Sequence, residues 1–115
     1  MTPLDFIDRP LDALRQPDPA LIFDVAELSA PPVRKRLLKA LLRRLNKQTV
    51  HHDELLAHTA YALAALSGKK RRKRLKLALR CFSRVARRQP ENAFAQIYLA
   101  YTLYDLSRFK SSLKA

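Results

Sequence analysis

The sequence contains one glycine in 115 residues. Turn-rich β folds and phosphate-cradling loops both depend on glycine, because its backbone reaches conformations that other residues avoid. The abundant residues are leucine, alanine, arginine and lysine, which favour helices. We therefore expect an all-α protein without a glycine-rich nucleotide loop.

Cysteine and long apolar segments are also scarce. Cys81 is the only cysteine, so the chain cannot form an internal disulfide, which fits a reducing compartment. The longest apolar run, residues 60–66, is far shorter than the roughly 20 residues of a membrane span. The acidic amino terminus does not look like a secretory signal. We expect a cytoplasmic protein, or a nuclear one in a eukaryote, without a membrane partner.

Acidic residues are few and concentrated near the amino terminus. Ten carboxylates stand against 23 lysines and arginines, for a net charge of +13. Residues 1–27 hold six acids and two bases, whereas residues 28–115 hold four acids and 21 bases. We divide the chain into an acidic amino-terminal arm or set of short helices, residues 1–30, and a basic helical domain, residues 31–115. The basic domain would attract polyanions.

Catalytic and metal-binding patterns are missing. The carboxylates show no paired acid–base arrangement, and no nucleophile motif or cofactor loop is present, so we expect no enzymatic activity and no cofactor. His51, His52 and His58 lack the i, i+4 spacing of metal ligands on one helix face, so we expect no metal site. Cys81 lies beside arginines that would activate a thiol, but a half-buried helical cysteine is the commoner case.

Two segments place cations opposite an apolar stripe at helical spacing. In residues 31–47 the cations form a second basic face: Lys35, Arg36, Lys39, Arg43 and Lys47. In residues 75–88 and just before them, the cations form what we call the basic ridge: Lys73, Lys76, Arg80, Arg84 and Arg87. No acid interrupts the ridge, so it is either a binding surface or a solvated helix face. Residues 33–47 also resemble a membrane-surface helix, although packing of the leucines on the domain explains them better.

The carboxyl-terminal half contains an internal sequence repeat. AYALAALS at 60–67 recurs as AYTLYDLS at 100–107, with Ala78-x3-Phe82 and Pro90 between them. This pattern resembles the tetratricopeptide repeat (TPR), a helix-turn-helix unit of 34 residues. The family's tryptophan is missing, and the earlier unit is six residues too long. The excess falls at residues 68–73, and we expect residues 69–74 to be an exposed insertion at the turn between the helices.

The resemblance covers residues 53–115 and implies a small right-handed stack of antiparallel helix pairs, five to seven helices in all. It also implies an interaction module, a scaffold or adaptor that binds an acidic protein or peptide or an amphipathic segment of a partner. First-helix positions on its inner surface are candidate inner-surface residues: Tyr61, Phe94, Ile97, Tyr101 and Tyr104. For the tyrosines, packing inside the domain is an equal alternative.

Two further expectations concern partners. The basic faces at 34–47 and 69–88 also suit sequence-nonspecific nucleic-acid binding, which remains open beside the adaptor function. The later repeat ends partway through its expected second helix, where Leu113 offers little cover. We therefore expect self-association, or a partner that completes the stack beside residues 94–115.

Overall fold

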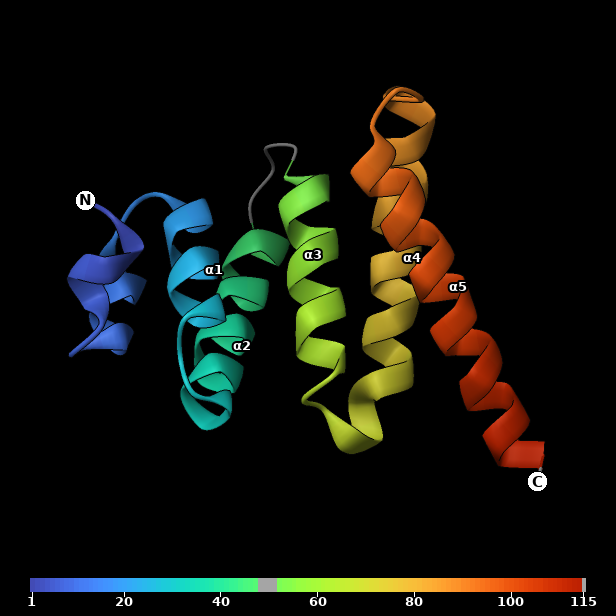
Figure 1. The fold of residues 1–115 in the computed structure, drawn as a ribbon, viewed down its shortest axis with the longest axis horizontal. Coiled ribbons are helices and arrows are strands. Elements are labelled where there is room, and N and C mark those ends of the chain that lie inside the picture. Colours follow the sequence, from blue (N-terminus) through green and yellow to red (C-terminus); the bar gives the residue numbers. More distant parts are fainter. Residues whose placement is uncertain (48–51, 115) are drawn as a thin grey trace. The chain divides into compact units, whose positions relative to one another are not determined.

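The computed structural model describes residues 1–47 and 52–114, with side chains in the last helix described as far as Arg108. These residues form five α-helices, three short 3-10 helices and no strand (Figure 1). The prediction of an all-α fold with five to seven helices is confirmed. The chain divides into two compact units, Met1–His51 and His52–Ala115, called unit 1 and unit 2 below. We had divided it after residue 30; the structural division comes later because the helix at 31–47 packs on the helix before it.

Proline starts every helix of unit 1. Its elements are η1 (Pro3–Phe6), η2 (Pro10–Arg15), α1 (Pro19–Glu27) and α2 (Pro31–Lys47). The fixed φ of proline suits a first helical position, and its missing N–H costs nothing there. Asp18 caps α1, because its Oδ1 accepts a hydrogen bond from the backbone N–H of Ala20 at 3.0 Å.

Two arginines of α2 hold the amino-terminal segments in place. Arg34 donates hydrogen bonds to the carbonyl oxygens of Ala26 at 3.1 Å and Ser29 at 3.0 Å. Ala26 lies in the last turn of α1 and Ser29 just after it, so Arg34 connects the carboxyl end of α1 to α2. Arg44 donates to the carbonyl oxygen of Gln16 at 2.8 Å. The acidic arm is thus a packed part of unit 1.

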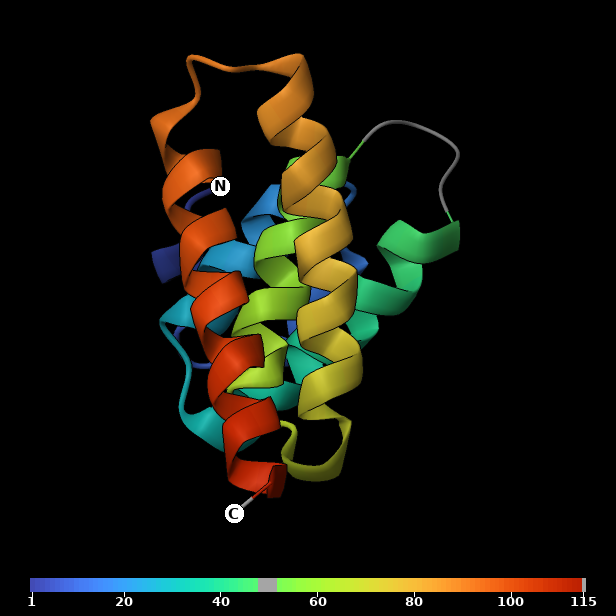
Figure 2. The same cartoon turned by 90° about the vertical axis from the view of Figure 1, so that its right-hand side faces the viewer.

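Unit 2 consists of three antiparallel α-helices and one short turn of 3-10 helix. Its elements are α3 (Asp53–Ala64), η3 (Gly68–Lys70), α4 (Arg71–Arg88) and α5 (Ala93–Lys114). Helix α4 packs against both α3 and α5 (Figures 1 and 2). The chain reverses between α3 and α4 at Gly68, whose φ of 50° is a conformation that favours glycine. The single glycine therefore lies at the turn that most requires one.

Two helix boundaries differ from those we expected. Residues 71–74 are not an exposed insertion: they form the first turn of α4, and Arg74 donates a hydrogen bond to the hydroxyl of Ser67. Helix α5 continues to Lys114 and does not turn into a second helix. No glycine or proline follows Pro90, so nothing in the sequence interrupts this helix. The side chain of Leu113 lies outside the described residues.

Candidate partner-binding surface

The basic ridge lies on the outer face of α4. Leu75, Ala78, Phe82 and Val85 on the opposite face are buried. All five ridge cations are exposed. From Lys73 to Arg87 the ridge extends about 21 Å, at 1.5 Å of rise per residue.

Arg84 differs from the other ridge cations because part of its charge is neutralised within unit 2. Asp53, in the first turn of α3, forms ion pairs with Arg84 at 3.3 Å and with Arg88 at 2.9 Å. Arg84 also donates a hydrogen bond to the sulfur of Cys81 at 3.3 Å. The spacing within α4 showed the ridge, but the acid that pairs with it comes from another helix. Lys73, Lys76 and Arg80 are thus the better candidates for contact with a partner.

The first turn of α4 carries charge of the wrong sign for its position. Residues 71–74 are all cations, and the turn contains no acid. The amino terminus of a helix carries partial positive charge, so cations there destabilise it. Helix stability does not explain these residues, and their positive field adds to that of the ridge.

Tyr61 belongs to an aromatic cluster inside unit 2. Its hydroxyl donates a hydrogen bond to Oδ2 of Asp105 at 2.8 Å, which links α3 to α5. Burial, reinforced by this hydrogen bond, raises the pKa of Tyr61 to about 12. Phe82 stacks on Tyr98 with centroids 5.6 Å apart, and His58 meets both rings edge-on. Tyr98, which we had not singled out, lies at the centre of this cluster.

The other four candidate inner-surface residues lie on the exposed side of α5. Phe94 is 69% exposed and Tyr104 is 61% exposed, and Ile97 and Tyr101 are also exposed. Between Ala93 and Arg108 the only charged residues are Asp105 and Arg108 itself. A helix that is apolar on all sides is normally covered on all sides. The outer face of α5 therefore has the composition of an interface.

Equivalent residues of the internal sequence repeat differ in burial between α3 and α5. In α3, Ala57, Ala60 and Ala64 are buried. Forty residues later, Ile97 and Tyr104 are larger and exposed. Helix α3 is followed by α4, which packs on it, whereas the described residues contain no helix after α5. Positions that are buried in α3 are therefore exposed in α5.

A groove between α4 and α5 joins the apolar and the cationic surfaces. We call it the α4–α5 groove; its volume is about 320 Å³, and it is lined by Arg72, Lys76, Leu79, Leu103, Leu106 and Ser107. Leu103 is 52% exposed. A neighbouring hollow on α4 is lined by Lys73, Lys76, Leu79 and Arg80. Leu79 and Leu106 are partly exposed, so leucine side chains and ridge cations lie side by side, an arrangement that helical spacing alone did not reveal.

The second basic face belongs to unit 1. Arg36, Arg43 and Lys47 are exposed on α2, and Lys35 and Lys39 are partly buried. The exposed arginines of this face make a matched control for the ridge.

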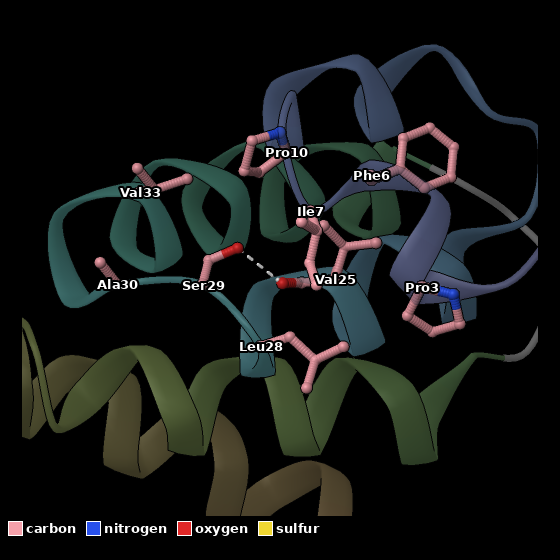
Figure 3. A pocket seen from close by; sticks show the side chains of 9 residues that line it. All are labelled: Pro3, Phe6, Ile7, Pro10, Val25, Leu28, Ser29, Ala30 and Val33. Atoms are coloured by element: carbon pink, nitrogen blue, oxygen red, sulfur yellow. Dashed lines mark hydrogen bonds between the residues drawn. The ribbon is translucent and has the colours of Figure 1, made fainter.

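A second apolar recess lies in unit 1. It has a volume of about 230 Å³ and is lined by Pro3, Phe6, Ile7, Pro10, Val25, Leu28, Ser29, Ala30 and Val33 (Figure 3). The Ser29 hydroxyl donates a hydrogen bond to the carbonyl oxygen of Val25 at 2.7 Å. No charged side chain lines this recess. We call it the unit 1 recess; its residues come from η1, η2, α1 and α2 and the segments between them, so no pattern within one helix could predict it.

The thiol and imidazole groups are arranged for packing. Cys81 is fully buried, and burial raises the pKa of its thiol although Arg84 acts in the opposite direction. The rings around His58 desolvate it, and burial lowers its pKa. Among the residues that the structure describes, no three His, Cys, Asp or Glu side chains form a metal site; His51 lies outside them. No described helix is both long and apolar enough to cross a membrane.

Comparison with known proteins yields no relative. No protein-family model matches the chain, and neither a curated protein nor a solved structure matches it.

Proposed function

We propose that this chain is a non-enzymatic, TPR-like protein-interaction module whose unit 2 binds an acidic, amphipathic helix of a partner. The observation that carries the proposal is the α4–α5 groove, where one exposed and two partly exposed leucines lie beside Lys76, and Arg80 lines the neighbouring hollow. Amphipathic helices commonly bind by laying their apolar side into such a groove.

The chemistry of the groove selects the partner. Leu79, Leu103 and Leu106 would cover the apolar side of the incoming helix, which supplies most of the affinity. Lys76 and Arg80 lie about 6 Å apart along α4, so acids one turn apart on the partner would reach both. Cations at the rim of an interface mainly raise the association rate and select the partner's charge. A basic helix would be repelled.

Nucleic acid suits this surface less well. Phosphates would contact the ridge cations, but a polyanionic backbone would leave the leucines of the groove and the aromatic face of α5 uncovered. The exposed apolar side chains therefore favour a protein partner.

A designed peptide tests the proposal. The probe is a fluorescent helical peptide of about 18 residues with leucines on one side and glutamates on the other. We expect it to bind the full chain, and a version with lysine in place of glutamate to bind far more weakly. Lys76→Gln with Arg80→Gln should weaken binding roughly tenfold and flatten its dependence on salt. Leu103→Ser should weaken binding without changing that dependence.

The second basic face supplies the control. Arg36→Gln with Arg43→Gln makes the same change in net charge on exposed arginines of unit 1, and it should leave peptide affinity almost unchanged. Equal effects of the two double variants would reduce the interaction to net charge and overturn the proposed site. If the peptide failed to bind and DNA of every sequence bound equally through Lys76 and Arg80, nonspecific nucleic-acid binding would replace the adaptor function.

A further inference from the structure

The amino-terminal segment presents two parallel rows of side chains. Backbone hydrogen bonds from residue i+3 to residue i recur along it, from Asp5 to Thr2, Ile7 to Leu4 and Arg9 to Phe6. In this 3-10 geometry, side chains three residues apart lie in line. One row is therefore apolar, with Leu4 and Ile7, and the next row is acidic, with Asp5 and Asp8.

Both rows face outward. Leu4 is 65% exposed and Ile7 is 61% exposed, and Asp5 and Asp8 are also exposed. The third row packs inward through Phe6. Ile7 and the exposed Leu28 also line the unit 1 recess, so the apolar row continues into it (Figure 3). We call this surface the acidic–apolar face.

The acidic–apolar face matches the α4–α5 groove in spacing and in charge. Asp5 and Asp8 lie about 6 Å apart at the 3-10 rise of 2.0 Å per residue. Lys76 and Arg80 lie about 6 Å apart at the α-helical rise of 1.5 Å. From Leu4 to Ile7 the apolar row is about 6 Å long. Residues 72–79 of the groove extend about 10 Å along α4.

We propose that a second copy of this chain occupies the α4–α5 groove through its acidic–apolar face, which rests on the proposed function and names its partner. Leu4 and Ile7 of one copy pack on the leucines of the groove, and Asp5 and Asp8 lie against Lys76 and Arg80. The two surfaces differ, so the contact is head-to-tail. Each added copy offers a new groove, and oligomers lengthen as concentration rises.

Charge decides between this contact and the symmetric pairing of two α5 helices. Residues 52–115 hold 14 lysines and arginines and four acids, so a symmetric pairing would bring together two units of net positive charge, although the α5 faces themselves carry little charge. Residues 1–27 hold six acids and two bases, and no other part of the chain has an excess of acids on this scale. The acidic–apolar face is therefore the complement that the chain itself provides.

Mixing two variants tests the head-to-tail contact. The donor variant carries Leu4→Ser and Asp8→Lys; the acceptor variant carries Lys76→Glu and Arg80→Glu. We expect the wild type to grow beyond its 13.2 kDa monomer in sedimentation velocity as concentration rises, and each variant to associate at least tenfold more weakly. The mixture should form a 1:1 dimer and nothing larger, because the acceptor variant keeps an intact donor face and the donor variant keeps an intact groove.

Matched controls identify the faces. Asp12→Lys, an exposed charge reversal in η2, and Arg36→Glu with Arg43→Glu on α2 should leave association as in the wild type. A wild type that remains monomeric, association that the donor variant does not weaken, or a mixture that fails to form the dimer would each overturn the proposal.

The designed acidic peptide distinguishes a failure of self-association from a failure of the proposed function. If the chain binds the peptide through Lys76 and Arg80 but stays monomeric, the function stands and the self-association fails. If the chain oligomerises but does not bind the peptide, self-association stands and the proposed function fails.

Discussion

Replacing Phe82 with alanine should destabilise unit 2 more than any other single truncation of an aromatic residue. Phe82 is fully buried in α4, and its ring stacks on Tyr98 and meets His58 edge-on at 5.0 Å. Truncating a buried phenylalanine costs about 3–5 kcal/mol, from lost burial and the cavity left behind. Each aromatic contact adds about 0.5–1.5 kcal/mol beyond burial, which places the expected cost in the upper part of that range.

Tyrosine fluorescence during urea unfolding measures this cost in unit 2 alone. The chain has four tyrosines and no tryptophan, and the tyrosines all lie between residues 61 and 104. Phe94→Ala removes the same atoms from a side chain that is 69% exposed, so its cost should remain within about 0.5 kcal/mol. If Phe82→Ala unfolds unit 2 outright, Phe82→Leu should show an intermediate loss of about 1–2 kcal/mol. Similar unfolding midpoints for the Phe82→Ala and Phe94→Ala variants would refute the packing of unit 2 described above.

Three further predictions concern charged and titrating groups. Asp53→Asn removes two partly exposed ion pairs and should lower the free energy of unfolding by about 0.5–1 kcal/mol in the same urea assay. Affinity for the acidic peptide should rise, because Arg84 is then free to contact it. A fall in affinity would contradict this prediction. Burial lowers the pKa of His58 below its unfolded value of 6.5, so the unfolded state binds more protons as pH falls through 6.5. The stability of unit 2 should therefore fall on acidification through that value, and less so in His58→Asn; equal slopes for the two proteins would count against it. Tyr61, with a pKa of about 12, should be the last tyrosine to ionise in an absorbance titration, and stability should fall from pH 10 upward as the unfolded state ionises first. Tyr61→Phe should abolish that late step; its persistence would assign the raised pKa to another tyrosine.

Local sequence signals predicted most of the helices. The leucines of residues 37–45 and the apolar stripe of residues 75–85 are periodic over several turns, and a helix is stabilised by hydrogen bonds and side chains within a few residues. Proline and Asp18 marked helix starts for the same local reason. Where such signals are missing, as between residues 69 and 74 and after residue 107, the helices extended further than expected.

The exposure of the ridge could also be read from the sequence. Once Leu75, Ala78 and Phe82 pack inward, the geometry of a single helix sends Lys76 and Arg80 outward. The same argument predicts which aromatic residues of α5 share a helix face. It does not predict which of these faces pack against another helix.

Only the tertiary structure decided which surfaces meet. The ion pair between Asp53 and Arg84, the burial of Tyr61 beside Asp105 and the exposure of Leu103 all depend on how separate helices pack. Residues far apart in the chain meet through the order and crossing of the helices, which no spacing within one helix encodes. The sequence by itself therefore determined where the cations and the apolar side chains lie on each helix, whereas the packing of α4 on α5 placed the two kinds beside each other.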